Sequence, residues 1–398
     1  MVDSFIPQIR FKMCKNQWEK NKLSKLAKFN PKSTLPEKFK YVDLESVLGT
    51  DLISYREVSR ENAPSRAQRL AQKGDIFYQT VRPYQKNNYL FDSNEKDYVF
   101  STGYAQLRPL IDSAFLLARL QEESFVNMVL ERCTGTSYPA INSKDLSKIS
   151  VTIPQTIEEQ SAIGSLFRTL DDLLTSYKEN LVNYQSLKAT MLSKMFPKAG
   201  QTVPEIRLDG FEGEWEVVNL GTLIENYDEV ISGTSGFPIA TSSRKGLYLQ
   251  NDYFEGGRTG IDLTLDFHRV PIGYVTYRHM SDDSIFKFNK NNFETDVLVS
   301  KEYPVFISND SSDIDFLLYH LNNSRLFLRF STMQKLGGTR VRLYYKNLIT
   351  YKIAVPTVKE QQAIGTYFSN LDQLITSYQE KITHLETLNK KLLQNMFI

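Results

Sequence analysis

Cysteine is nearly absent from this sequence, and histidine is scarce. Among 398 residues there are two cysteines, Cys14 and Cys133, and four histidines. Two cysteines cannot build a disulfide framework or a four-cysteine zinc site. The sequence also has no apolar run of about 18 residues, the length that a membrane span requires, and its N-terminus lacks the apolar core of a signal peptide. We therefore expect a cytoplasmic protein without a membrane span.

Motifs for familiar catalytic chemistry are missing as well. The sequence contains no GxxxxGK(S/T) phosphate-binding loop, no GxGxxG fingerprint and no HExxH zinc motif. It has no Asn/Asp-Pro-Pro-Tyr/Phe motif for adenine methylation and no nuclease cluster of carboxylates and lysine. The histidines are scattered, at His268, His279, His320 and His384. We therefore expect no catalytic residue and no metal site on this chain.

The composition is that of a folded protein, with 41% hydrophobic residues, 24% charged residues and a net charge of +2. The charge is uneven along the chain. Residues 1–150 contain 23 Lys and Arg against 17 Asp and Glu, whereas residues 201–352 contain 16 against 20. Within this acidic half, residues 316–352 contain seven basic residues and no acidic one. That stretch predicts a local basic patch.

The strongest feature of the sequence is an internal repeat. Residues 159–196 align without gaps with residues 360–397, and 17 of 38 positions are identical. Near the N-terminus, IPQIRFKMCKNQWEKNKL aligns at one constant offset with VPEIRLDGFEGEWEVVNL at 203–220. The chain therefore consists of two tandem units, each a variable domain followed by a well-matched segment. We expect variable domains at 1–153 and 197–355, and matched segments at 154–196 and 356–398.

Each matched segment has the pattern of a long helix. Thr156 with Glu159, and Thr357 with Glu360, have the T-x-x-E spacing of a capping box. Pro197 ends the first copy. A helix of about 40 residues is roughly 60 Å long, and a helix of that length usually pairs with another one.

Apolar residues at steps of three and four form one stripe along each helix, which predicts a coiled coil. The stripe residues are Ile163, Leu166, Leu170, Leu173, Tyr177, Tyr184, Leu187 and Met191 in the first copy, and Ile364, Tyr367, Leu371, Leu374, Tyr378, Leu385, Leu388 and Leu392 in the second. Polar residues interrupt the stripes, at Asn180 and Lys194 and at Lys381 and Asn395. We expect the helices to pair antiparallel with pseudo-two-fold symmetry, and Asn180 to lie close to Lys381. An unpaired amphipathic core helix is the alternative.

Each matched segment also has a glycine near its start, Gly164 in the first and Gly365 in the second. Glycine inside a helix costs about 1 kcal/mol relative to alanine. Close approach of another backbone would explain these glycines, and so would a frayed helix end.

The variable domains are predicted to be mixed α/β. Segments rich in Tyr, Phe, Val and Ile and bounded by turn residues predict strands within 74–83, 98–109, 245–254 and 273–280. DSAFLLARLQEESFVNMVLERC at 112–133 and DIDFLLYHLNNSRLFLRFSTMQ at 313–334 each predict a helix. The fold class is therefore α/β (α+β), with two mixed domains joined by the two long helices.

The remaining candidates for function are basic, amide, hydroxyl and aromatic residues in expected loops. They are Arg82, Tyr84, Gln85, Lys86, Asn87 and Asn88; Thr136, Ser137 and Tyr138; Arg244 and Lys245; Arg278; and Gly338, Thr339, Arg340 and Arg342. Arg and Lys hold phosphates or guanine edges, and Asn and Gln suit adenine, so this mixture is typical of a DNA reader. The alternative for each residue is a solvated loop side chain. Arg82 and Arg340 stand out because Pro or Gly neighbours fix their loops.

Two variable domains alternating with two long helices resemble the specificity (S) subunit of type I restriction-modification systems. The resemblance rests on the paired EEQSAIG and KEQQAIG helices, on the paired PQIRF and PEIRL segments with their following WE, and on the phrases GDIFYQTVRP and STGYAQLRP. It covers essentially the whole chain. It implies target recognition domains that each read one half of a split double-stranded DNA target, in the cytoplasm of a bacterium or archaeon.

The same resemblance implies the partners. The paired helices would set the distance between the half-targets and bind two methylation (M) subunits, and restriction (R) subunits would complete the complex. S-adenosylmethionine, ATP and Mg are expected on those partner subunits, and no cofactor is expected on this chain. Helices of the expected length would put the half-sites about one DNA turn apart, roughly 34 Å between centres.

One feature departs from the resemblance, which is the acidic balance of the second domain, because DNA-binding domains gain much of their affinity from phosphate contacts. Either its basic stretch faces the duplex or the M subunits supply the positive charge. Two other functions stay open at this point. A coiled-coil scaffold whose variable domains bind proteins would show no DNA sequence preference. A self-contained methyltransferase or nuclease is opposed by the missing motifs.

Overall fold

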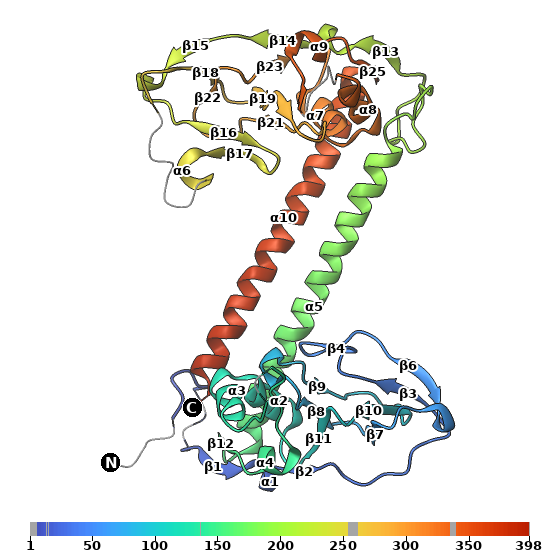
Figure 1. Cartoon of the computed structure of the whole chain (residues 1–398), viewed down its shortest axis with the longest axis vertical. Helices are drawn as coiled ribbons and strands as arrows, with labels where there is room; N and C mark the ends of the chain where they lie inside the picture. Colours follow the sequence, from blue (N-terminus) through green and yellow to red (C-terminus); the bar gives the residue numbers. More distant parts are fainter. Residues whose placement is uncertain are drawn as a thin grey trace. The chain divides into compact units, whose positions relative to one another are not determined.

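The structure is a computed structural model that describes residues 6–12, 14, 16–135, 137–253, 262–334 and 340–397. It divides into two compact units (Figure 1). Unit 1 comprises Met1–Asn180 with Tyr378–Ile398, and unit 2 comprises Leu181–Ser377. Each unit therefore combines one variable domain with the start of one long helix and the end of the other.

Unit 1 is built on two four-stranded sheets. Their strand orders are β6 (Arg56–Ser59), β3 (Lys38–Val42), β10 (Tyr98–Ser101), β7 (Ala67–Leu70), and β2 (Ala27–Phe29), β11 (Tyr104–Pro109), β8 (Ile76–Gln79), β9 (Tyr89–Leu90). Two further pairs are β1 (Glu19–Lys22) with β12 (Ser150–Ile153), and β4 (Val47–Leu48) with β5 (Asp51–Leu52). The short helices are α1 (Leu23–Leu26), α2 (Ser113–Gln121), α3 (Glu123–Leu130) and α4 (Ser143–Ser147).

Unit 2 has one sheet of four strands and one of three. They are ordered β14 (Ile224–Tyr227), β23 (Val305–Ser308), β19 (Val275–Tyr277), β21 (Phe288–Lys290), and β15 (Val230–Ser232), β18 (Asp266–Val270), β22 (Val297–Ser300). Three further pairs are β16 (Ala240–Ser243) with β17 (Gly246–Leu249), β20 (Met280–Ser281) with β24 (Val341–Arg342), and β13 (Glu216–Asn219) with β25 (Lys352–Val355). The short helices are α6 (Gln250–Tyr253), α7 (Ile314–Asn323), α8 (Arg325–Met333) and α9 (Tyr345–Leu348).

The mixed α/β class of both domains is confirmed, and several predicted elements are divided. Each segment predicted as one helix forms two, because Glu122 and Ser324 adopt extended backbone angles and cap the second helix with their side chains. The segment 98–109 forms two strands, β10 and β11, which belong to different sheets. The segment 245–254 forms β17 and then α6, so its second half is helical where a strand was predicted.

The two predicted long helices are confirmed as α5 (Ile157–Lys194) and α10 (Val358–Asn395), each of 38 residues. The capping boxes form only in part. The backbone N–H of Glu159 donates to Thr156 Oγ1 (3.4 Å), but the Glu159 carboxylate accepts from Arg10 (2.6 and 2.8 Å). Arg207 binds the carboxylate of Glu360 in the same way (both 2.7 Å). Both glutamates are buried. Each carboxylate bonds the charged guanidinium of Arg10 or Arg207, because a charged donor is a stronger partner than the backbone amide of a capping box.

The two helix glycines lie where another helix approaches closely. A Cβ atom added at Gly164 would lie 2.6 Å from the backbone N of Phe115, at the start of α2. At Gly365 it would lie 2.7 Å from Asp313 Oδ1, in the N-terminal cap of α7. Close packing therefore explains both glycines, and the frayed-end alternative is wrong. Because α5 and α10 are fixed to α2 and α7 in this way, each long helix starts as part of its variable domain.

The antiparallel pairing of α5 and α10 is confirmed within each unit. In unit 1 the start of α5 packs against the end of α10, and Lys178 forms an ion pair with Glu386 (3.0 Å). Tyr177 meets Tyr378, its own repeat partner, with ring centroids 5.6 Å apart. In unit 2 the end of α5 meets the start of α10, where Lys188 pairs with Asp372. The match of Tyr177 with its own repeat partner fixes the register at this crossing.

The predicted stripe needs three corrections. Leu173, Leu187 and Leu374 are 38%, 38% and 41% exposed, so they do not line the buried seam. Phe167, Leu174 and Phe368 are buried in addition to the predicted residues. For Leu173 and Leu374 the reason is that each helix start packs against its own domain as well as against the other helix, so its buried face is not a single stripe. The exposure of Leu187 has no such explanation. Lys381 lies over the ring of Tyr177 (5.7 Å), and its proximity to Asn180 remains a prediction.

Each long helix ends in the core of the unit that it enters. Phe397 packs in unit 1 against Trp18 and Phe167, with ring centroids 6.2 and 5.7 Å away. Phe196 packs in unit 2 against Trp215 and Phe368 at 6.3 and 6.2 Å. Both phenylalanines are buried. The hydrophobic core of each unit is therefore completed by residues from the end of the other repeat's helix.

Candidate nucleic-acid interface

In unit 1 the structure brings two of the predicted segments together. Arg82 has a left-handed backbone (φ 53°), and its N–H donates to the carbonyl of Pro139 (2.7 Å). Its guanidinium lies over the ring of Tyr138, 4.3 Å from the centroid. Tyr84 and Tyr138 are 50% and 65% exposed. The loop after β8 and the loop after α3 thus present one surface with an arginine and two exposed tyrosines, and Ser137 is exposed beside them.

Several other predicted residues hold this loop in place. Asn87 Oδ1 accepts from the N–H of Gly49 (2.9 Å), which attaches the β4–β5 turn to the loop. Gln85 Oε1 accepts from Gln79 (2.8 Å), and Lys86 forms an ion pair with Glu123. Asn88 needs correction as a DNA-contact candidate. It is 1% exposed, and both ends of its amide are bonded within the domain. Its role is therefore structural.

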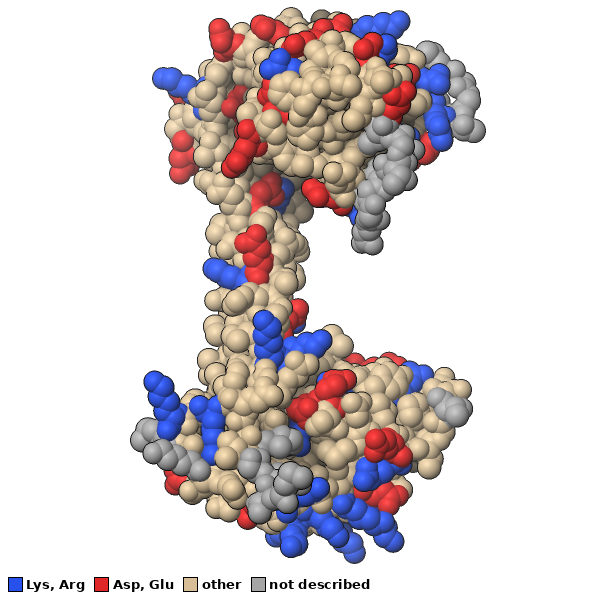
Figure 2. Space-filling model, turned by 90° about the vertical axis from the view of Figure 1, so that its left-hand side faces the viewer, with Lys and Arg blue, Asp and Glu red and all other residues tan. Residues whose placement is uncertain are grey.

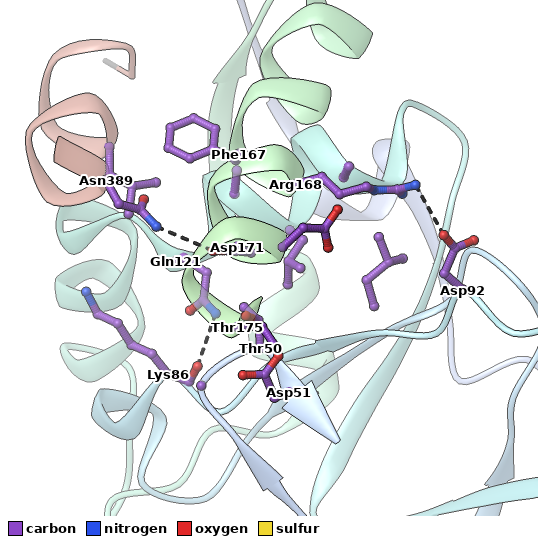
Figure 3. Close-up of a pocket in the computed structure, with 17 residues that line it drawn as sticks. Thr50, Asp51, Lys86, Asp92, Gln121, Phe167, Arg168, Asp171, Thr175 and Asn389 are labelled. Atoms are coloured by element: carbon purple, nitrogen blue, oxygen red, sulfur yellow. Dashed lines mark hydrogen bonds and ion pairs between the residues drawn. The ribbon is translucent and has the colours of Figure 1, made fainter. Parts of the chain in front are cut away.

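A cavity of about 400 Å³ lies beside this loop in unit 1 (Figure 3). It is bordered by the β4–β5 turn, α2, the start of α5 and the end of α10, and Lys86 from the loop lines it. Arg168 pairs with Asp92 across one side (3.1 Å). Asp171 faces Asn389, whose Nδ2 is 3.4 Å away. Burial, followed by the charges of Asp51 and Asp172, raises the pKa of Asp171 to about 6.

In unit 2 the candidates gather around the β16–β17 hairpin. Its turn consists of Arg244 and Lys245, and both line a cavity of about 660 Å³ together with Arg278. All three are exposed. Arg244 forms an ion pair with Asp283 (2.6 Å). Sequence segments that are more than thirty residues apart thus meet at one cavity.

The pairing of β20 with β24 places the remaining candidates nearby. Arg342 lies opposite Met280 in this pair, and Met280 is two residues after Arg278 in the sequence. Arg340 pairs with Asp282 (2.9 Å), and both side chains are more than half exposed. The predicted candidates Thr136, Gly338 and Thr339 lie outside the described residues.

Sequence reasoning missed Lys287, which lines the same cavity as Arg278 and Lys245. No local motif marks Lys287, because its place at the cavity depends on how β21 packs against the hairpin. The visible faces in Figure 2 show acidic side chains widely over unit 2 and groups of basic ones along the edge of unit 1. The basic side chains at the cavity of unit 2 therefore form a small group on a domain whose surface also has many acidic side chains.

The described residues contain neither a group of metal-ligating side chains nor a helix that could span a membrane. Within the described ranges, His, Cys, Asp and Glu do not form a group of three or more that would hold a metal ion. Nor does any described helix have the length and apolarity to cross a membrane. His320 is buried and its ring bonds Tyr351 (2.8 Å), and burial lowers its pKa to about 4. A neutral, buried imidazole in the core of unit 2 has a structural role.

Comparison with known proteins identifies the family. The model of the type I restriction modification DNA specificity domain matches residues 15–184 and again residues 237–387. The chain therefore belongs to this family, and it contains the domain twice. The two matches lie in the two repeats, so each repeat contains one copy of this domain.

Individual relatives are more distant. The protein named type I restriction enzyme MjaVIII specificity subunit, from Methanocaldococcus jannaschii, is 22% identical over 310 residues, which are 72% of this chain and 70% of that protein. The type I restriction enzyme HindI specificity subunit of Haemophilus influenzae is 30% identical over 139 residues, 33% of this chain and 30% of that one. The crystal structure of a type I restriction-modification S subunit from M. genitalium has a TM-score of 0.60 at 14% identity, over 99% of both chains. This last similarity supports the fold.

Proposed function

We propose that this chain is the DNA specificity subunit of a type I restriction-modification complex, and that each unit reads one half of a bipartite target. The observation that carries the proposal is the repeated placement of partly or fully exposed Arg, Lys and Tyr side chains at loops of a mixed α/β domain. In unit 1 these are Arg82, Tyr84 and Tyr138, and in unit 2 they are Lys245 and Arg278. Cationic and aromatic side chains of this kind contact phosphates and base edges.

The remaining parts of the proposal concern partners. The α5–α10 pair sets the distance between the half-targets and binds two M subunits, which carry S-adenosylmethionine and methylate adenine. The R subunits carry ATP and Mg and add cleavage. This chain directs those activities and has no catalytic residue of its own. Support comes from the family membership and from the buried anchoring of each helix in both units.

Methylation-site sequencing tests the proposal. Cells that carry this chain with its cognate M subunit should show adenine methylation at two short, unlike sequences separated by a fixed unread spacer. The half-sites should lie about one turn of DNA apart, roughly 34 Å. A single continuous motif would contradict two-unit reading. If the complex showed no DNA sequence preference at all, the scaffold function would replace it.

A further inference from the structure

A second cavity in unit 2, of about 520 Å³, lies on the other side of the β16–β17 hairpin. It is bordered by β17, β21, α7 and the paired part of α5 and α10. Four lysines line it, Lys188, Lys245, Lys287 and Lys290. Two of them, Lys245 and Lys287, also line the larger cavity that contains Arg278. The two cavities together have six basic lining residues and four acidic ones, Asp282, Glu302, Asp315 and Asp372.

The acidic residues in this cavity are already paired. Asp315 accepts both of its close contacts from Lys290 (2.8 and 2.9 Å). Asp372 pairs with Lys188 and also accepts from the hydroxyl of Tyr319 (2.7 Å). Among the residues that the structure describes, Lys287 forms no ion pair or hydrogen bond through its side chain. The cavity therefore contains a lysine that no ion pair or hydrogen bond holds among the described residues.

The surroundings of Lys287 disfavour the charged form of its amine. Burial, and then the charge of Lys188, lowers the pKa of its amine, while Asp372 raises it only in part. An anion in the cavity would lie between Lys287 and the exposed Lys245 and would offset both effects. A lone lysine on an open surface has no such need, because water solvates it.

The matched cavity of unit 1 has the opposite character. Asp171 and Asn389 of unit 1 occupy the repeat positions of Asp372 and Lys188, and the unit 1 cavity is lined by four aspartates with one lysine and one arginine. An anion would be repelled there. The same place in the architecture thus differs between the units in the charge of the group that it can accept.

We propose that the lysine-lined cavity beneath the β16–β17 hairpin binds a phosphate group through Lys287 and Lys245. In the assembled complex this group is a backbone phosphate of the duplex that unit 2 reads, an assignment that rests on the proposed function. Lys245 is next to Arg244 in the hairpin turn and faces the cavity of Arg278, so a duplex read at that cavity brings its backbone to the hairpin. This site explains how a domain with an acidic balance holds DNA.

The first test measures binding of the complex of the full chain and its M subunits to duplex DNA over a range of KCl concentrations. Replacing one phosphate contact lowers the slope of log K against log salt by about one. Lys287→Gln should show this change and about ten-fold weaker binding at low salt, on cognate and unrelated duplexes alike, with the methylated motif unchanged. Lys287→Arg should restore the slope. Lys359→Gln removes an exposed charge in the first turn of α10, outside both cavities and outside the basic stretch 316–352, and should leave the slope unchanged.

Three results would overturn the site: an unchanged slope in Lys287→Gln, an equal change in Lys359→Gln, or weakening confined to the cognate duplex. Equal melting temperatures of the variants show that folding is intact. If the wild-type complex does not distinguish cognate from unrelated DNA, the proposed function fails by itself. The phosphate site is then decided by the second test.

The second test measures the rate at which Lys287 of the full chain is acylated, by mass spectrometry. Duplex DNA should protect Lys287 at concentrations where inorganic phosphate and ATP do so only weakly. Stronger protection by inorganic phosphate or ATP than by duplex would overturn the assignment to DNA and indicate a free phosphate compound. The absence of protection by all three would overturn the site.

Discussion

Asp171 in unit 1 lies beside the amide of Asn389, whereas at the matched positions of unit 2 Asp372 pairs with the amine of Lys188. In both units an arginine near the start of the repeat forms an ion pair with a glutamate in the first turn of the long helix, Arg10 with Glu159 and Arg207 with Glu360. Both units also contain a glycine near the start of the long helix and a buried phenylalanine from the end of the other long helix. The comparison teaches that the contacts which hold each domain to the helix pair are retained after duplication, while the residues around the cavities have diverged in charge. Fold and binding surface have changed independently.

The largest expected effect tests the likeness of the units. Phe397→Ala and Phe196→Ala each remove a buried ring from a core, and each should lower the free energy of unfolding of its unit by about 3–5 kcal/mol. Denaturant unfolding of the full chain, followed by hydrogen exchange of each unit, measures this. Leu187→Ala, at a 38% exposed position, is the control and should cost far less. If only one of the two phenylalanine variants lowered the stability of its unit, the two units would not be held together in the same way.

The helix glycines should be the next most sensitive positions. Gly164→Ala should destabilise unit 1 by about 1–3 kcal/mol, because overpacking against the start of α2 exceeds the gain in helix propensity. Gly365→Ala should cost less, since its added Cβ would be 3.3 Å from the backbone N of Phe316 where Gly164 has 2.6 Å to Phe115. Thermal melting of both variants measures the order. If either variant melted higher than the wild type, close packing would not explain the glycine.

Specificity should divide between the units. Arg82→Ala should relax recognition in one half of the target, and the double change Arg340→Ala with Arg342→Ala should relax the other half. Loss of a base contact costs about 1–3 kcal/mol of discrimination. Sequencing of methylated sites would show degenerate positions in a single half for each variant. An unchanged methylation pattern would count against these arginines as readers.

The same substitution at matched aspartates should have opposite signs. The pKa of Asp171 is raised from 3.8 to about 6, so the folded state binds more protons than the unfolded state between these values, and stability falls as pH rises through this window. Asp171→Asn should therefore stabilise unit 1 by about 1–2 kcal/mol at pH 8 and have little effect near pH 4. Unfolding at both pH values measures this.

Asp372→Asn is the matched variant in unit 2. It breaks the ion pair with Lys188 and weakens the hydrogen bond from Tyr319, so it should destabilise unit 2 by about 1 kcal/mol at pH 8. Stabilisation by both substitutions would show that the charge difference between the cavities has no energetic consequence.

The sequence was sufficient for the features that depend on local pattern. The long helices, their antiparallel pairing and the mixed α/β domains follow from a repeat and a period that are visible in single segments. The exposed positions of Leu173 and Leu374 were not predictable, because each helix start has two packing partners and the sequence stripe shows only one. Asn88 looked like a loop residue, but its burial depends on contacts with Gln79 and Gln121.

The sequence predicted which kinds of residues lie at the candidate surface. It did not predict which of them lie next to one another. Arg82 and Tyr138 are both in predicted loops, but only the bridge between Val81 and Ala140 brings them together. Lys188, Lys245 and Lys287 come from a long helix, a hairpin turn and the loop residue before β21, and no sequence pattern links them. Cavities formed by several elements depend on tertiary packing, which periodicity and turn signals do not specify.

The burial of Phe397 in unit 1 has a consequence for biosynthesis. During translation, the ribosome must make all of residues 181–377 before the residues that complete the unit 1 core emerge. Unit 1 must therefore wait, with Trp18 and Phe167 lacking a neighbour, while unit 2 receives Phe196 at the start of its own synthesis. A chain that ends at Ser377 and has left the ribosome should consequently contain a complete core in unit 2 and an incomplete core in unit 1, so that the order of folding is the reverse of the order of synthesis.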